Sequence, residues 1–269
     1  DLPTSTNGVN YRLFVRAPLR EPADGESATS IYLLDAIANF APAASMSFNY
    51  EHFNYMPASY FIGIGYQNEA NGHALEENRT RDYTPSRFEP ADGSHFLSGN
   101  PASYKGSGGA EVFLDVVEKQ IIPFIQSRFA VDKTDRVLVG SSIGGLLATH
   151  ALLKRPGLFN RYVIISPSIW WDDWYKPRSE RNIMLTAAET AKTVYPQETR
   201  AYFVVGDSEE RFGLVTDLYV LVNTLRKSQN EQLKVHLDVL PNELHEGMFP
   251  TGFMRGILAI YAQEPARDR

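Results

Sequence analysis

The stretch Val137-Leu-Val-Gly140-Ser141-Ser142-Ile-Gly144-Gly decides the fold of this chain. A short apolar run enters a glycine, further glycines flank a serine, and residues that favour a helix follow. Gly140, Ser142 and Gly144 fit the pattern Gly-x-Ser-x-Gly, which predicts a nucleophile elbow, a sharp strand-to-helix turn that exposes a serine hydroxyl. Ser141 does not fit this spacing. The alternative is a Gly- and Ser-rich loop that binds phosphate or has no chemical role.

Two of the six histidines lie late enough in the chain to serve the elbow serine. In triads built on such an elbow, the chain order is serine, then Asp or Glu, then histidine. His236 lies in the alternating segment 233–240, which predicts a strand. His245 follows that segment in a predicted loop, from which an imidazole can reach the serine. We therefore expect Ser142 to be the nucleophile and His245 to be its general base.

Three acidic residues compete for the third place in the triad. The apolar run 201–206 ends in glycine and predicts a buried parallel strand, and Asp207, Glu209 and Glu210 follow it. A carboxylate at this strand end would orient the imidazole and stabilise its protonated form. Glu209 is the first candidate and Asp207 is the second. Any of these acids could instead be a solvated loop charge or a helix cap.

Predicted strands and helices alternate along most of the chain. The strands are expected near residues 11–17, 30–35, 60–66, 137–141, 162–166, 201–206 and 233–240. The helices are expected at 109–129, where Pro123 would bend or end the pattern, after Gly144, at 214–228 and after Pro250. This alternation predicts a mostly parallel sheet with helices on both faces. With the elbow, it indicates an α/β-hydrolase fold in a single domain over residues 1–269.

Composition narrows the function further. The chain has 43% hydrophobic residues, 22% charged residues and a net charge of −6, which argues against a nucleic-acid surface. No apolar stretch approaches the roughly 18 residues of a membrane span. The absence of cysteine excludes disulfides, thiolate metal sites and cysteine nucleophiles. The chain begins with Asp1 rather than Met, as expected of a processed product, and its location stays open between the cytoplasm and the periplasm or secretion.

Residues 67–108 form a long polar segment without hydrophobic periodicity, which predicts a loop insertion. The segment follows a predicted strand, at the edge where open α/β sheets bind ligands. Arg79 and Arg81 are therefore candidates for contact with an anionic substrate. The alternative is a structural tie, in which Arg81 and Asp82 anchor the segment through hydrogen bonds.

Several blocks of sequence resemble one hydrolase family. They are Leu33-Leu-Asp35, Ile62-Gly-Ile-Gly-Tyr66, Arg79-Thr-Arg-Asp-Tyr-Thr-Pro85, Gly140-Ser-Ser-Ile-Gly-Gly145 and Ser166-Pro-Ser-Ile-Trp-Trp171. In this order they resemble the esterase-D-like family of α/β-hydrolases, and most of all its branch of enterobactin and salmochelin trilactone esterases. The resemblance spans most of the chain. It implies a serine hydrolase of carboxylic esters that needs no metal or organic cofactor. Because some members of this branch work with a Ser–His pair, the resemblance leaves the need for an acid open.

The expected chemistry proceeds through an acyl-enzyme. His245 would take the proton of Ser142 as its hydroxyl attacks an ester carbonyl. The backbone N–H of Ile143 and a second N–H from the loop after the strand at 30–35 would bind the oxyanion. By position the second donor is Ala36 or Ile37. The family often has glycine where this chain has Ala36, which leaves that donor open.

Aromatic residues near the predicted site admit two interpretations. Trp170 and Trp171 follow the strand at 162–166 and could stack on aryl groups of a substrate such as a catecholate. They could equally pack beneath the long loops.

For the whole chain, the expected partner is a small-molecule ester. An acyltransferase, a feruloyl or small-acyl esterase, and a non-catalytic binding module are the alternatives. Oligomeric state is left open.

Overall fold

The computed structural model describes residues 1–22, 27–68, 72–88, 106–171 and 176–262. In these ranges, seven strands form one sheet in the order β1-β3-β2-β4-β5-β6-β7. β1 pairs with β3 in the antiparallel direction, and every other pair is parallel. The strands are β1 (Tyr11–Arg16), β2 (Ala28–Leu33), β3 (Ser59–Tyr66), β4 (Val131–Ser141), β5 (Arg161–Ile165), β6 (Thr199–Gly206) and β7 (Leu233–Leu240).

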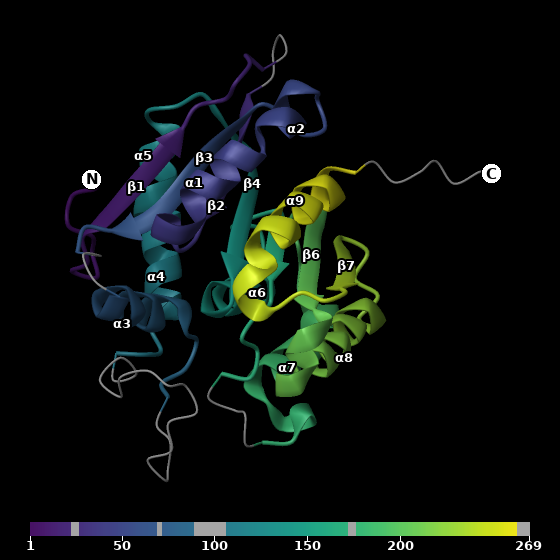
Figure 1. Cartoon of the computed structure of the whole chain (residues 1–269). Helices are drawn as coiled ribbons and strands as arrows, with labels where there is room; N and C mark the ends of the chain where they lie inside the picture. The colour runs from purple at the N-terminus through teal and green to yellow at the C-terminus, as the bar shows by residue number, and fades with distance from the viewer. Residues whose placement is uncertain (23–26, 69–71, 89–105, 172–175, 263–269) are drawn as a thin grey trace.

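Helices cover both faces of the sheet (Figure 1). α1 (Ala36–Met46) and α9 (Met248–Tyr261) lie side by side on one face. On the other face, α6 (Ile143–Lys154) packs on β4 and β5, and α8 (Leu214–Lys227) packs on β6 and β7. The remaining α-helices are α2 (Phe48–His52), α3 (Gly72–Tyr83), α4 (Ala110–Val116), α5 (Ile122–Gln126) and α7 (Asn182–Ala188). The predicted α/β-hydrolase fold is confirmed by this architecture.

Alternating side chains of the central strands supply the two hydrophobic cores. In β5, Tyr162 and Ile164 belong to the core beneath α6 and α8, whereas Val163 and Ile165 belong to the core beneath α1 and α9. All four side chains are fully buried. Because parallel strands are covered on both faces, they read as continuous apolar runs, which is why the sequence located them.

The predicted loop at 67–108 is corrected in part. Its residues 72–83 form helix α3, while 69–71 and 89–105 lie outside the described residues. The helix packs against α4 and α6, and its buried side chains include the polar Asn78, Thr80 and Asp82. A helix whose buried face is polar leaves no hydrophobic periodicity in the sequence. Pattern reading therefore predicted a loop at this position.

Pro123 does not end the predicted helix at 109–129. α4 runs into a π-helical turn over Val117–Ile121, and α5 begins at Ile122 with the proline in its first turn. The first turn of a helix tolerates proline because its N–H groups have no partner inside the helix. Among the described residues, none of the helices combines the length and apolar character needed to cross a membrane.

Candidate active site

The turn after β4 has the geometry of a nucleophile elbow. Ser142 has a φ of 59°, in a region that side-chain-bearing residues rarely adopt, and α6 begins at the next residue. The strand and helix approach so closely that a Cβ atom at Gly140 would overlap the carbonyl oxygen of Gly144. A Cβ atom at Gly145 would lie 2.9 Å from the carbonyl oxygen of Ile165. Contact with backbone atoms therefore requires glycine at positions 140 and 145.

Replacing Gly140 with alanine is expected to lower the free energy of unfolding by about 1–3 kcal/mol, because the turn must open to admit the methyl group. Urea unfolding followed by circular dichroism measures the change. Gly106→Ala is a matched control, since a Cβ atom there would meet Arg81 at an ordinary 3.7 Å. Equal unfolding midpoints for the two variants would show that the turn yields without cost.

Ser142, His245 and Glu209 form a chain of hydrogen-bond contacts. His245 Nε2 lies 3.1 Å from Ser142 Oγ, and His245 Nδ1 lies 2.6 Å from Glu209 Oε2. An ionised carboxylate only accepts hydrogen bonds, so Nδ1 carries a proton and donates it to Glu209. In neutral imidazole Nε2 then has a free lone pair that accepts the Ser142 hydroxyl. These three side chains come from the ends of β4 and β6 and from the loop after β7.

Glu209 is held in one orientation by its surroundings. The residue is 1% exposed, and its Oε1 accepts hydrogen bonds from Ser166 Oγ at 2.6 Å and from the Gly206 N–H at 2.9 Å. Burial by itself would raise the pKa of Glu209, but the hydrogen bonds from His245, Ser166 and Gly206 hold that pKa below its ordinary value. The carboxylate is therefore charged at neutral pH and oriented toward the imidazole.

Asp207, the second candidate acid, has different contacts. It is exposed, and its Oδ1 accepts the backbone N–H of Asn242 at 2.9 Å and the Ser208 hydroxyl at 3.1 Å. His245 meets Glu209 and not Asp207. Of the two acids predicted at the end of β6, Glu209 is the one that the structure brings to the histidine.

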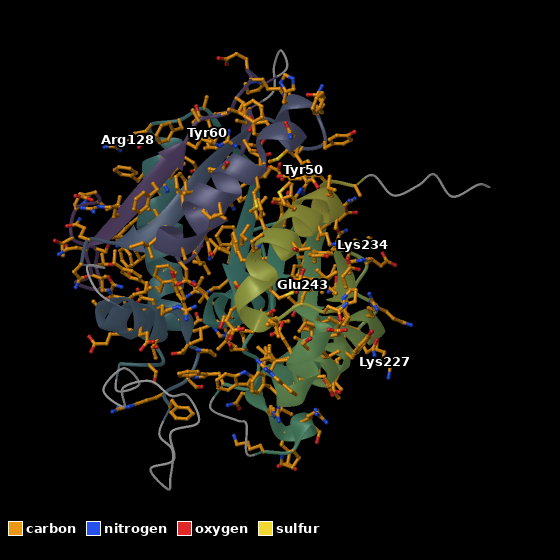
Figure 2. The ribbon with its side chains drawn as sticks, in the orientation of Figure 1. Tyr50, Tyr60, Arg128, Lys227, Lys234 and Glu243 are labelled. Atoms are coloured by element: carbon orange, nitrogen blue, oxygen red, sulfur yellow. The ribbon has the colours of Figure 1, made fainter. Side chains whose placement is uncertain are left out.

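The loop that carries His245 rests on the end of β6. A Cβ atom at Gly206 would overlap the carbonyl oxygen of Glu243, two residues before the histidine. The Glu243 carboxylate accepts the Thr251 hydroxyl at 3.2 Å, and Figure 2 shows Glu243 beside the first turn of α9. These contacts fix the distance between the histidine loop and the strand that presents Glu209.

Two helix N-termini meet beside Ser142. Ile143 and Ala36 are the first residues of α6 and α1, and the N–H groups of a first helical turn have no partner inside the helix. The two ends are adjacent, because a Cβ atom at Gly144 would lie 3.2 Å from Asp35 Oδ2 and 3.5 Å from Leu34 Cβ. Positive helix ends favour a nearby anion. The arrangement suits an oxyanion formed at Ser142.

The two arginines predicted to meet an anionic substrate are both engaged by carboxylates. Arg79 makes a bidentate ion pair with Asp35, with Nε–Oδ1 and Nη2–Oδ2 distances of 3.0 and 2.9 Å. Arg81 makes a similar pair with Asp82 at 2.8 and 2.9 Å. Arg81 also lines a polar pocket of about 220 Å³ beside β1. Ser142, His245 and Glu209 do not line this pocket. The structural tie foreseen for Arg81 and Asp82 is therefore present.

The two tryptophans predicted at the rim differ in exposure. Trp171 is 3% exposed, packs against Phe88 with a ring-centroid distance of 5.3 Å, and donates its indole N–H to the Ser86 carbonyl at 3.0 Å. These contacts favour the packing interpretation for Trp171. Trp170 is half-buried and stays a candidate.

Sequence reasoning missed two serines that line the site. Ser166 supports Glu209, and Ser168, which is 2% exposed, has its Oγ 3.4 Å from Ser142 Oγ. Both belong to the Ser166-Pro-Ser block after β5, which the family resemblance included without giving either serine a role. A further signal was their position at the carboxyl end of β5, a strand that pairs with β4.

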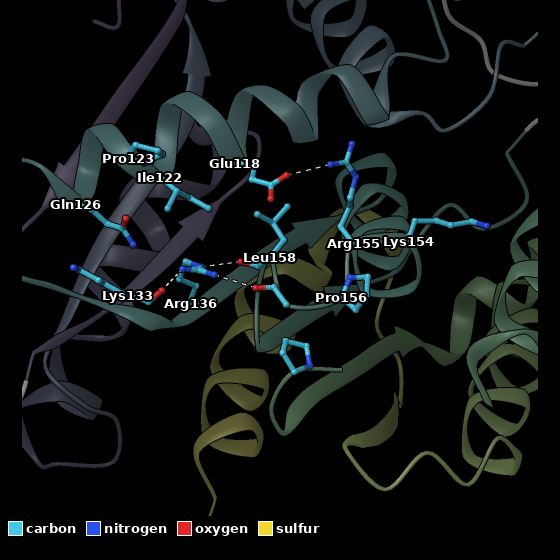
Figure 3. Close-up of a pocket in the computed structure, with 12 residues that line it drawn as sticks. Glu118, Ile122, Pro123, Gln126, Lys133, Arg136, Lys154, Arg155, Pro156 and Leu158 are labelled. Atoms are coloured by element: carbon cyan, nitrogen blue, oxygen red, sulfur yellow. Dashed lines mark hydrogen bonds and ion pairs between the residues drawn. The ribbon is translucent and has the colours of Figure 1, made fainter. Parts of the chain in front are cut away.

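A further hollow lies away from these residues. About 620 Å³ in volume, it lies at the amino ends of β4 and β5 (Figure 3). There Arg136 donates to the backbone carbonyls of Lys133, Gly157 and Leu158, and Arg155 pairs with Glu118. Within the described residues, no group of three or more His, Asp and Glu side chains is arranged to hold a metal ion.

The fold and the Ser142–His245–Glu209 arrangement define an α/β-hydrolase with a serine-centred site. Residues 8–248 match the esterase family described as "Putative esterase". The chain belongs to this family, and the predicted resemblance is confirmed.

Three relatives illustrate the similarity. A siderophore triacetylfusarinine C esterase of Aspergillus fumigatus is 52% identical over 68 residues, covering 25% of this chain and 23% of that protein. A siderophore enterobactin esterase of Emericella nidulans is 33% identical over 158 residues, covering 56% and 50%. The crystal structure of the BES protein of Bacillus cereus superposes with a TM-score of 0.79 at 26% identity, covering 97% and 94% of the two chains. This chain thus spans at most half the length of the two curated relatives.

Proposed function

We propose that this protein is a serine esterase that hydrolyses carboxylic esters through an acyl-enzyme on Ser142. The observation that carries the proposal is the hydrogen-bonded series from Ser142 Oγ through His245 to a buried, charged Glu209. Membership of the esterase family supports the same reaction. We also propose that residues 1–269 act as one catalytic domain, because the site draws on strand ends from across a single sheet.

In the proposed reaction, His245 Nε2 accepts the Ser142 proton as Oγ attacks the ester carbonyl carbon. The tetrahedral oxyanion is bound by the N–H of Ile143 and by that of Ala36. Protonated His245, stabilised by Glu209, then gives its proton to the departing alkoxide, which leaves as the alcohol. Water then enters, and its oxygen attacks the acyl carbon as His245 takes one of its protons. The bond between that carbon and Ser142 Oγ breaks, His245 returns the proton to Oγ, and the acid leaves. No step requires a metal or an organic cofactor.

We propose that the substrates are siderophores and that the enzyme hydrolyses their ester bonds. Two relatives carry that activity in their names, one for triacetylfusarinine C and one for enterobactin. Half-buried Trp170 would offer an aromatic face for such ligands at the rim. The protein would be incubated with triacetylfusarinine C and, separately, with enterobactin. Separation of the products by liquid chromatography would compare the rates at which the two esters are hydrolysed.

Reaction with a fluorophosphonate probe tests the serine chemistry. We expect turnover of p-nitrophenyl acetate, loss of that turnover after labelling, and a probe adduct on the tryptic peptide 137–154. That peptide holds both Ser141 and Ser142, so fragment ions must place the adduct on Ser142. The Ser142→Ala protein is the control and should stay unlabelled. An active wild-type enzyme labelled on another residue, or an inactive and unlabelled one, would contradict the proposal.

A further inference from the structure

Asp35 holds an unusual position between β2 and α1. Its φ and ψ are 52° and 51°, in the left-handed region, and the residue is 6% exposed. It lies directly before α1 where a capping residue would, yet its side chain makes no capping hydrogen bond to that helix. The carboxylate turns instead toward α3 and binds the Arg79 guanidinium through both oxygens. The Asp35 carboxylate therefore binds Arg79, 44 positions away in the sequence, instead of capping α1.

Helix α3 holds Asp35 at a second point. Tyr83 follows Arg79 by four residues, which places both side chains on one face of the helix. The fully buried Tyr83 hydroxyl accepts the backbone N–H of Asp35 at 3.2 Å. The side chain and the main chain of one strained residue are therefore both tied to α3. Left-handed conformations of residues other than glycine persist only where the surroundings enforce them.

The same residue lies against the elbow. The distance of 3.2 Å from Asp35 Oδ2 to a Cβ atom built on Gly144 leaves space for glycine and little more. Leu34, just before it, donates its N–H to the carbonyl of Val139 in β4 at 3.1 Å. The direction of the N–H groups that follow Asp35 is therefore set relative to Ser142 by contacts on both sides.

Charge gives the ion pair a second consequence. A lone carboxylate beside Ser142 would repel the negative charge that develops on an attacked ester. Arg79 cancels that charge through two short hydrogen bonds and is itself only 21% exposed. Burial by itself would lower the pKa of Arg79, but its interactions with Asp35 raise that pKa, so the guanidinium stays charged. The pair adds no net charge to the site.

We propose that Arg79 and Tyr83 are positioning residues, which hold Asp35 so that the first N–H groups of α1 face the oxyanion at Ser142. The inference rests on the proposed esterase function, because it concerns the transition state of that reaction. It replaces the interpretation of Arg79 as a contact for a substrate anion. The two interpretations differ in the kinetic constant that they affect.

Steady-state kinetics with a neutral and an anionic ester separates them. For Arg79→Gln we expect kcat to fall by about 10- to 100-fold with both p-nitrophenyl acetate and p-nitrophenyl hydrogen succinate, with KM changed less than about threefold. A substrate-anion contact would instead raise KM for the succinate ester alone and leave kcat for the acetate unchanged. That second result would overturn the proposal.

The double variant Asp35→Asn/Arg79→Gln provides a rescue test. It removes the unpaired carboxylate and leaves two amides that can hydrogen-bond, so its kcat should exceed that of Arg79→Gln. Glu77→Gln, an exposed position on the same helix, is the matched control and should keep wild-type constants. If Arg79→Gln does not fold, Tyr83→Phe removes one hydroxyl only and should still lower kcat more than KM. A double variant no faster than Arg79→Gln would contradict the charge argument.

These outcomes are distinct from failure of the proposed function. If the wild-type protein neither turns over esters nor reacts with a fluorophosphonate, the esterase assignment itself fails. If the wild type is active and labelled, and folded Arg79→Gln and Tyr83→Phe keep kcat within about threefold, only the positioning role fails.

Discussion

Ser142→Ala and His245→Gln are each expected to lower kcat for p-nitrophenyl acetate by about 10⁴- to 10⁶-fold, and the double variant should be no slower than either. The alanine variant has no nucleophile, and the glutamine variant leaves a serine hydroxyl that no base deprotonates. Since the two side chains act in one step, removal of the second changes nothing further. Steady-state rates of the purified proteins, with the uncatalysed rate subtracted, measure all three.

Ser141→Ala is the matched control for this comparison. The residue is adjacent to the nucleophile and has the same side chain, but lies outside the Gly-x-Ser-x-Gly spacing. Its kcat should stay within about tenfold of the wild type. Additive losses in the double variant, or a larger loss for Ser141→Ala than for Ser142→Ala, would contradict the assignment of the elbow.

The second large effect concerns Glu209. Glu209→Gln should lower kcat by about 10³- to 10⁴-fold, because a neutral amide neither fixes the proton on His245 Nδ1 nor stabilises the protonated imidazole. Asp207→Asn should lower kcat less than about fivefold, since Asp207 contacts the Asn242 N–H rather than the histidine. The ratio of the two kcat values measures how much of the reaction depends on the acid. A small loss for Glu209→Gln would favour a Ser–His pair.

Acid stability supplies an independent check on Glu209. Its pKa is lowered in the folded protein, so the charged form stabilises the fold above the unfolded-state pKa of about 4.3. That contribution is lost as pH falls through the lowered folded-state value. The stability difference between wild type and Glu209→Gln at neutral pH should therefore shrink in acid. Urea unfolding at several pH values measures it, and a difference that grows below pH 4 would contradict the assignment.

The parts of the fold that the sequence predicted are those in which local pattern and burial coincide. β3, β5 and β6 lie inside the sheet and appear as uninterrupted apolar runs. α1 was missed because it contains Pro42 and buries only three of its residues, among them Asn39. α3 was missed because its inward face is partly polar. Neither helix therefore shows a clear hydrophobic periodicity in its sequence.

The candidate site also contains residues that the sequence predicted and residues that only the folded structure identifies. Ser142 and His245 follow from a motif and from chain order, which are properties of the sequence. The choice between Glu209 and Asp207 depends on which carboxylate turns inward after β6, and that is decided by Ser166 and the Gly206 N–H. The Asp35–Arg79 pair joins residues that are 44 positions apart. Pairings of this kind become visible only once the chain is folded.

Three residues other than glycine adopt positive φ at the carboxyl ends of three adjoining strands, β2, β4 and β5. They are Asp35, Ser142 and Ser166, with φ values of 52°, 59° and 43°. Each such conformation disfavours the native state by about 1–3 kcal/mol. Selection for heat resistance alone would tend to relax these turns, because relief there raises the melting temperature at the expense of turnover. A thermostable form of this protein is better sought through changes at the amino ends of the strands, with these three positions left as they are.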